Sequence, residues 1–202
     1  MPALGSCWRS VSQRAALVRK PSGSVTRDVH LEPRLALAKA GDSVAFEELL
    51  GPNLEPAFRL AMAMLKDRAA AEDAVQEAAL KSWRHLGHVR SEAELKPWFL
   101  GITANECRNI RRSRWWRVVK SDELPEHIGR SPVHPDTDDR IDLGAALDQL
   151  PHRHLLALSL YYLLDLSIED VAKVLGCSNA AARQRIHRAV DAIRPRLVEV
   201  NA

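Results

Sequence analysis

The stretch that decides the fold reads Leu166-Ser-Ile-Glu-Asp-Val-Ala-Lys-Val-Leu-Gly-Cys-Ser-Asn179. Ser167, followed three residues later by Asp170, is typical of a capping box that begins a helix. Gly176 readily adopts the left-handed conformation that ends a helix, and Ser178 can cap the next one. The pattern predicts two helices joined by a tight turn.

The second of these helices is expected over residues 180–194. Its small and apolar residues recur at helical spacing and form a seam turned toward a core: Ala182, Ile186, Ala189 and Ile193. Its outward positions carry side chains that hydrogen-bond guanine, adenine and phosphate in a DNA major groove: Arg183, Gln184, Arg185, His187 and Arg188. The pattern indicates a helix-turn-helix DNA reader; the alternative is a plain helical hairpin with a solvated basic face.

Length and composition restrict the fold class. A chain of 202 residues holds one large domain or two small ones, and 46% hydrophobic with 27% charged residues excludes disorder throughout. The apolar stretches are shorter than the roughly 18 residues that span a bilayer. Only ten aromatic residues and few strand signals leave an all-α fold as the expectation, with two small helical domains.

Three widely spaced cysteines, without a C-x-x-C pair, argue against a disulfide framework or a zinc site: Cys7, Cys107 and Cys177. They suit a reducing cytoplasm. We expect no metal, no cofactor and a cytoplasmic location.

Charge is strongly segregated along the chain. The net charge is +5 over residues 1–27, −5 over 42–80, +6 over 96–120, −6 over 121–150 and +5 over 173–196. Two basic helical segments therefore flank an acidic connector, which favours contact with an anionic partner at two separate places.

Four segments follow from these patterns. We expect a flexible basic arm over residues 1–30, a helical unit over 31–120, an acidic proline-containing linker over 121–138 and a second helical unit over 139–202. A targeting peptide or a start codon placed too far upstream are alternatives for the arm, whose role stays open.

Helix boundaries can be predicted from caps, glycines and prolines. In the first unit helices are expected to start near Pro33, after Gly41 with Asp42 or Ser43 as cap, after Gly51-Pro52, at Ala69 with an end at Gly87, and at Pro97. In the second unit we expect helices over residues 141–150 and 152–164, followed by two short ones.

The helix over residues 96–117 combines aromatic and basic residues. Trp98 and Phe99 have the spacing of core residues, whereas Trp115 and Trp116 accompany a set of polar and basic residues: Asn105, Arg108, Arg111, Arg112, Arg114 and Arg117. Rings stack on exposed bases and guanidinium groups follow phosphates, so this helix is suited to single-stranded or melted DNA.

Carboxylates gather on the helix that ends at Trp83: Asp67, Glu72, Asp73 and Glu77. No histidine or cysteine lies among them and no glycine loop adjoins, which argues against metal binding or acid-base catalysis. We expect an acidic face that docks a basic partner, with a plain solvated face as the alternative.

Three stretches together resemble bacterial extracytoplasmic-function sigma factors of the sigma-70 family. They read Asp67-Arg-Ala-Ala-Ala-Glu-Asp-Ala-Val-Gln-Glu-Ala-Ala-Leu-Lys-Ser-Trp83, Lys96-Pro-Trp-Phe-Leu-Gly-Ile-Thr-Ala-Asn-Glu-Cys-Arg-Asn-Ile-Arg-Arg112, and residues 165–188. The resemblance covers roughly residues 34–200 and implies a non-catalytic initiation factor that directs core RNA polymerase to promoter DNA. It also implies an anti-sigma factor as partner. We expect neither a membrane nor a small-molecule substrate as a partner.

The resemblance assigns roles to particular residues. Docking on the coiled coil of the largest polymerase subunit would fall to Asp67, Glu72, Asp73, Gln76 and Glu77. Melting and reading of the minus-ten element would fall to the loop from His88 to Glu94 and to Asn105, Arg108, Asn109, Arg111 and Arg112. The minus-35 element would be read by Arg183, Gln184, Arg185, His187 and Arg188, and the acidic linker would occupy the RNA exit path.

Three positions depart from the family pattern. Ala181 lacks a side chain that could contact phosphate or base, Ala79 replaces an aromatic residue, and Asn109 replaces an acidic one. The departures at Ala181 and Asn109 bear on promoter preference. A stand-alone helix-turn-helix regulator that binds duplex DNA without polymerase is the main alternative, and an enzyme acting on an anionic substrate is a second one that no phosphate loop, nucleophile-base pair or metal cluster supports.

Overall fold

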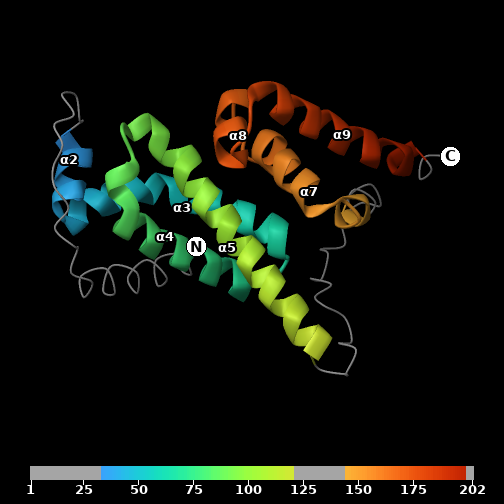
Figure 1. Cartoon of the computed structure of the whole chain (residues 1–202), viewed down its shortest axis with the longest axis horizontal. Helices are drawn as coiled ribbons and strands as arrows, with labels where there is room; N and C mark the ends of the chain where they lie inside the picture. The colour runs from blue at the N-terminus through green and yellow to red at the C-terminus, as the bar shows by residue number, and fades with distance from the viewer. Residues whose placement is uncertain (1–32, 121–143, 199–202) are drawn as a thin grey trace.

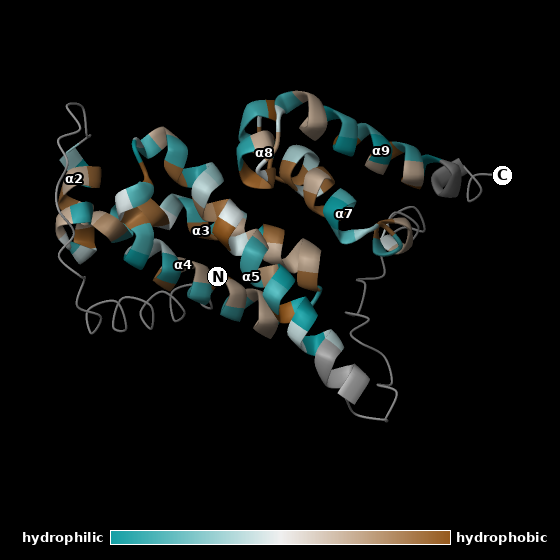
Figure 2. Cartoon of the chain, viewed as in Figure 1, coloured by the Kyte–Doolittle hydropathy of each residue, from teal (hydrophilic) through white to brown (hydrophobic). Residues whose placement is uncertain are grey.

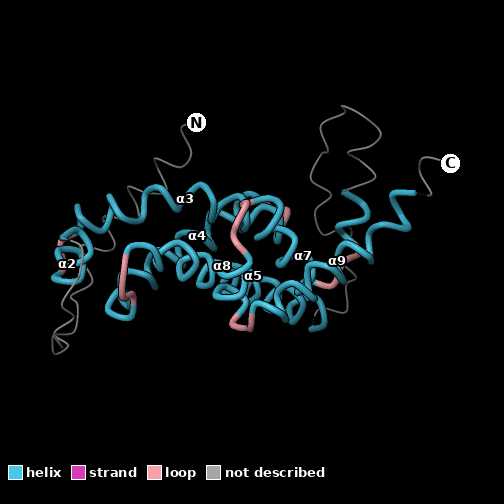
Figure 3. The backbone as a smooth tube through the Cα atoms, turned by 90° about the horizontal axis from the view of Figure 1, so that it is seen from above, coloured by secondary structure: helices cyan, strands magenta, loops and turns pink. Residues whose placement is uncertain are grey.

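A computed structural model describes residues 33–120 and 144–198, with side chains described up to residue 115 in the first range and 194 in the second. The expected arm and linker lie outside these ranges. Helices account for all regular structure in the described ranges, which confirms the all-α prediction (Figures 1 and 3). The elements are α2 (Pro33–Ala40), α3 (Ser43–Leu65), α4 (Arg68–His85), η1 (Leu86–His88), α5 (Glu92–Lys120), α7 (His152–Leu158), η2 (Ser159–Leu163), α8 (Ile168–Leu175) and α9 (Asn179–Val198).

Helices α2 to α5 pack around one apolar core. The inner face of α4 is built from alanines, which allow α3 and α5 to approach closely: Ala71, Ala74 and Ala78 are fully buried. Phe99 on α5 is also fully buried, and Phe46 packs edge-on against Trp83 with ring centroids 5.0 Å apart. Figure 2 shows the hydrophobic residues on the sides of these helices that face one another.

The start of α3 follows the sequence prediction, but its length does not. Asp42 is the cap, and its Oδ1 accepts hydrogen bonds from the backbone N–H groups of Val44 and Ala45. The predicted break at Gly51-Pro52 was wrong, because α3 continues to Leu65. Buried residues of α3 lie both before and after Gly51-Pro52 in the chain. Their packing outweighs the unfavourable helix propensity of glycine and proline.

The junction of α4 and α5 also differs from the prediction. Helix α4 ends at His85, and Gly87 lies within the 3₁₀ turn η1 rather than at a left-handed end. Helix α5 begins at Glu92, five residues before Pro97. Acidic side chains in its first turn stabilise this start, because they lie at the positive end of the helix dipole. The expected reading loop from His88 to Glu94 therefore includes this first turn.

The C-terminal unit contains the predicted helix-turn-helix. The Oγ of Ser167 accepts a hydrogen bond from the N–H of Asp170 at 3.1 Å, and Gly176 is left-handed with φ of +61°. Ser178 Oγ accepts from Ala181 N–H at 3.2 Å and so caps α9. The prediction of two short helices was wrong for α9, which runs for 20 residues.

The two helical units contact each other. Helix α8 packs on α5, and both α7 and η2 pack on α3 (Figure 1). The guanidinium of Arg59 donates to the carbonyl oxygen of Leu163 at 2.9 Å, and Lys66 forms an ion pair with Asp148. This arrangement places the helix-turn-helix beside the long basic helix α5.

Candidate nucleic-acid and polymerase interface

Helix α9 presents a basic outer face. Its seam is buried as predicted, with Ala182, Ile186 and Ala189 inside, and Figure 2 shows hydrophilic residues alternating with apolar ones along the helix. The five predicted minus-35 residues occupy the other positions; Arg185 is half-buried and the rest are exposed. Within the described ranges, none of these five side chains forms a hydrogen bond or an ion pair. They are therefore available to an anionic ligand.

The positive charge of α9 also affects the pKa of His154 on α7, the helix against which α9 packs. Burial lowers the pKa of His154, and the positive charges of Arg153, Arg188 and Arg185 lower it further. The neutral form of this histidine is favoured, because a proton there would add to a cluster of cations. The electrostatic potential around His154 is therefore positive, which favours the binding of phosphate groups.

Helix α5 carries the predicted minus-ten residues on an exposed surface, but here the side chains bond to one another. Arg108 donates to the Oδ1 of Asn105 and, through Nε, to the carbonyl oxygen of Ala104 at 3.3 Å. Arg112 donates to the Oδ1 of Asn109 at 3.5 Å. These contacts between residues three or four apart favour particular orientations of the two asparagines on the helix.

Arg111 is turned to the side of α5 that faces its neighbours. It donates to the carbonyl oxygen of Met64 at 3.5 Å, near the end of α3. Its charge and that of Arg108 also reach His152, whose Nε2 is buried without a hydrogen-bond partner among the described atoms. Burial first, and then these two charges, lower the pKa of His152 to about 4.

The aromatic residues of α5 separate as predicted. Phe99 is fully buried, and Trp98 is partly buried against the core. Trp115 is 57% exposed near the far end of the helix, among arginines. The side chains of Trp116 and Arg117 lie outside the described residues. An exposed indole beside guanidinium groups can stack on an unpaired base.

The acidic face of α4 lies opposite its buried alanines. Glu72, Asp73, Gln76 and Glu77 share one side of the helix, as residues three and four apart do. Asp73 and Glu77 are exposed, whereas Glu72 is half-buried and accepts a hydrogen bond from Arg68 Nε at 3.0 Å. The exposed carboxylates can meet a cationic partner.

Asp67 differs from the other predicted docking residues. Its Oδ1 caps α4 by accepting from Ala70 N–H at 3.0 Å, and its Oδ2 pairs with Arg114 of α5 at 2.8 Å. The Ala70 hydrogen bond first, and then Arg114, lower the pKa of Asp67. This carboxylate therefore helps to fix α4 against α5, although its side chain remains 40% exposed.

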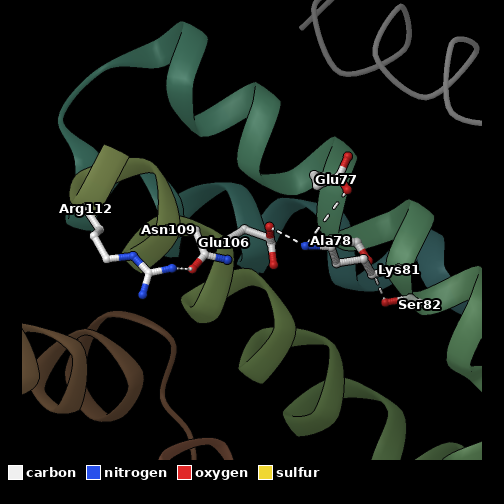
Figure 4. Close-up of polar contacts among 7 residues, drawn as sticks. All are labelled: Glu77, Ala78, Lys81, Ser82, Glu106, Asn109 and Arg112. Atoms are coloured by element: carbon white, nitrogen blue, oxygen red, sulfur yellow. Dashed lines mark hydrogen bonds and ion pairs between the residues drawn. The ribbon is translucent and has the colours of Figure 1, made fainter. Parts of the chain in front are cut away.

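One ion pair at this site was missed by sequence reasoning. Lys81 on α4 pairs with Glu106 on α5, with 2.7 Å between Nζ and Oε2 (Figure 4). The signal was present, because Glu106 is the single acid among the seven basic residues of 96–120. An isolated acid in a basic helix, next to predicted base-reading residues, can be expected to have a cation as partner where it is buried.

No cluster of three metal-ligating side chains occurs in the ranges 33–120 and 144–198, and none of their helices is long and apolar enough to cross a membrane. Cys107 is buried in α5, and this burial raises the pKa of its thiol to about 12. It therefore stays protonated and unreactive at neutral pH.

Comparison with known proteins places both units in one family. The sigma-70 region 2 family matches residues 35–117, and the sigma-70 region 4 family matches residues 140–193. Together these matches cover more than half of the chain.

Individual relatives agree with this placement. The RNA polymerase sigma factor SigV of Bacillus subtilis is 30% identical over 144 residues, which cover 70% of this chain and 84% of SigV. The probable RNA polymerase sigma factor RfaY of Xanthomonas campestris is 30% identical over 182 residues, but this chain spans only 46% of its length.

Solved structures show the same architecture. The sigma factor RpoE of Bartonella quintana, in complex with the anti-sigma factor NepR, matches with a TM-score of 0.64 and 26% identity over 78% of this chain and 98% of RpoE. CnrH, in complex with the cytosolic domain of CnrY, matches with a TM-score of 0.60 at 19% identity, covering 84% of this chain and 97% of CnrH, and supports the fold alone. The chain belongs to the extracytoplasmic-function group of the sigma-70 family, and its function is promoter-specific initiation of transcription.

Proposed function

We propose that this initiation factor divides its work among three helices: α9 binds the minus-35 duplex, α5 binds the melted minus-ten strand, and α4 docks on core RNA polymerase. It acts by binding, without a catalytic step. The observation that carries the proposal is the separation of charge, with two exposed basic helices and one acidic face on the same packed structure.

The role of α9 rests on its outer face, whose predicted minus-35 side chains form no hydrogen bond or ion pair with another described residue. Such arginine side chains can reach phosphates and the O6 and N7 atoms of guanine in a major groove. Arg183, Gln184, Arg185, His187 and Arg188 supply these contacts. Ala181 lies next to them and contributes no polar group, which narrows the set of bases that this helix can distinguish.

The role of α5 rests on its bonded asparagines and its exposed indole. Asn105 and Asn109 offer amide groups that can pair with an unstacked base, while Arg108, Arg111 and Arg112 follow the backbone of the strand. Trp115 supplies a stacking surface. These residue types bind single strands better than duplex DNA, because stacking requires an exposed base.

The role of α4 rests on Asp73 and Glu77. Both are exposed and four residues apart, so they meet one side of a basic partner helix. Glu72 and Gln76 extend the same face, and Asp67 contributes by holding the start of α4. A cationic coiled coil on the polymerase is the expected partner.

An anti-sigma factor is a further proposed partner. The sigma factor RpoE, which is 26% identical to this chain, is described in complex with the anti-sigma factor NepR. A partner that covered α4 or α5 would keep this chain from polymerase. Because polymerase and promoter DNA are both cytoplasmic in bacteria, the cytoplasm is the proposed location.

In vitro transcription tests the proposal. Purified chain is added to bacterial core RNA polymerase with a library of promoter fragments, and the transcripts are sequenced. Reproducible start sites that depend on the chain, preceded by two shared sequence elements, are the expected result. Absence of any chain-dependent start site would contradict the proposed function, and tight duplex binding by a chain that directs no transcription would favour the stand-alone regulator.

A further inference from the structure

We propose that Lys81 is a positioning residue that couples the polymerase-docking face of α4 to the minus-ten helix α5. The inference rests on the proposed function and deepens it. Lys81 lies between two carboxylates: Glu106 on α5, whose Oε2 is 2.7 Å from Nζ, and Glu77 on the docking face, whose Oε1 is 3.9 Å away (Figure 4).

Burial makes the two carboxylates unequal partners. The Glu106 side chain is 9% exposed, whereas the Glu77 side chain is 47% exposed. A carboxylate removed from water requires a hydrogen-bonded cation to stay ionised at low cost. Among the described residues, Lys81 is the cation within ion-pair distance of Glu106. Glu77 can exchange Lys81 for water or for a polymerase side chain, but Glu106 cannot.

The position of Glu106 connects this pair to DNA reading. Glu106 follows Asn105 directly and lies three residues before Asn109, whose Oδ1 accepts from Arg112 (Figure 4). An ion pair at this point fixes the rotation of α5 relative to α4. Recognition requires side chains to be held within about 0.5 Å, so this rotation decides where both asparagines meet a base.

Docking on polymerase changes the competition for Lys81. A basic polymerase side chain that binds Glu77 removes the weaker of the two partners, and the ammonium group of Lys81 is then shared with Glu106 alone. The α4–α5 contact becomes firmer when the factor is docked. By linkage, a promoter strand that requires this geometry strengthens docking by the same factor.

The test compares Lys81→Met with Arg84→Met, which removes a positive charge from an exposed position of the same helix. Full-length variants are assembled with core polymerase on a promoter fragment selected by the transcription assay. Core affinity is measured by fluorescence anisotropy, and strand opening by permanganate reactivity of minus-ten thymines at saturating holoenzyme.

Lys81→Met is expected to lower strand opening about tenfold, because a hydrogen bond to a charged group is lost, and to change core affinity by less than about threefold. Arg84→Met should leave strand opening at the wild-type level. Lys81→Arg, which keeps the charge, should restore most of the opening, a rescue that a purely space-filling role would not produce.

A double-mutant cycle keeps the test decisive if Lys81→Met folds poorly. In a Glu106→Gln background, Lys81→Met should have little further effect, because the buried charge that needs a partner is gone. Equal tenfold losses in both backgrounds, or wild-type opening by Lys81→Met, would overturn the inference. Wild-type protein that directs no transcription would instead overturn the proposed function, and this inference with it.

Discussion

The two helices that we propose to contact DNA, α5 and α9, hold their basic side chains in different ways. On α5, the predicted base-reading side chains bond to one another and to neighbouring backbone, as in Arg108 with Asn105 and Arg111 with Met64. On α9, the corresponding side chains form no hydrogen bond or ion pair within the described ranges. The difference matches the proposed ligands, because a flexible single strand must be captured by a preformed surface, whereas a rigid duplex lets flexible arginines adjust to it.

Charge reversal on the acidic face of α4 is expected to have the largest effect on function. It should abolish the contribution of α5 but not that of α9. Asp73→Arg with Glu77→Arg should weaken core polymerase binding at least about a hundredfold, because like charges then meet across the interface. Single-strand capture by α5 should disappear with docking, whereas duplex binding by α9 should persist. Polymerase pull-down and a gel shift with duplex DNA measure the two effects.

Glu48→Arg, at an exposed acidic position on α3, is the matched control for this reversal. It should leave polymerase binding unchanged. If the double reversal still retained polymerase at wild-type affinity, the docking role of α4 would have to be abandoned.

The contact between the two helical units should be sensitive to acid through His152. This side chain is neutral in the folded protein down to about pH 4, whereas an unfolded histidine gains its proton near pH 6.5. Between these values the unfolded state binds more protons, so stability is complete above pH 6.5 and falls as the pH is lowered toward 4. The loss at pH 5 is expected to be about 1–2 kcal/mol after solvent screening at a half-buried site.

Urea unfolding at pH 7.5 and pH 5 measures this loss. His152→Gln should reduce the difference between the two pH values by that amount, and the exposed His85→Gln should preserve it. A wild-type protein equally stable at both values would show that His152 is not held between the charges of Arg108 and Arg111.

Arg185→Ala tests α9, whose basic side chains form no hydrogen bond with another described residue. Loss of one base or phosphate contact should weaken minus-35 duplex binding about tenfold, and a lost phosphate contact should reduce the salt slope by about 0.9. Because this side chain has no described hydrogen-bond partner, the thermal midpoint should change by less than about 2 °C. Fluorescence anisotropy across a salt series, with thermal melting, gives both values.

The control for this change is Arg194→Ala, further along α9, whose guanidinium lies 3.7 Å from Asp191. Its effect on duplex binding should be smaller than about twofold. A large stability loss in Arg185→Ala would contradict the proposed difference between α5 and α9. It would show that side chains on α9 are also held by contacts within the protein.

Local sequence signals predicted the helix caps but missed features that depend on packing between helices. Caps and turns depend on neighbouring residues, so Asp42, Ser167 and Gly176 could be predicted from the sequence. The continuous helix through Gly51-Pro52 could not, because the packing that sustains it comes from other helices. The pairing of Lys81 with Glu106 joins residues 25 apart, and its partner depends on how α4 and α5 cross.

The smallest effect is expected from Asn109→Asp, which places an acidic residue where the family usually has one. An ion pair between the introduced carboxylate and Arg112 would replace the 3.5 Å amide contact and hold the α5 surface more firmly. A carboxylate accepts from cytosine N4 but cannot donate to a base as an amide does, so minus-ten preference should shift by about threefold among competing sequences.

Competition between promoter fragments with altered minus-ten elements measures this shift, and fragments with altered minus-35 elements are the control. The minus-35 preference should stay at its wild-type value, because α9 contains none of the changed contacts. An equal shift at both elements would mean that the packed arrangement of α5 and α8 transmits changes from one reader to the other. In that case the hydrogen bonds on the α5 surface would affect both DNA contacts. The two helices would then differ in position but not in how they bind DNA.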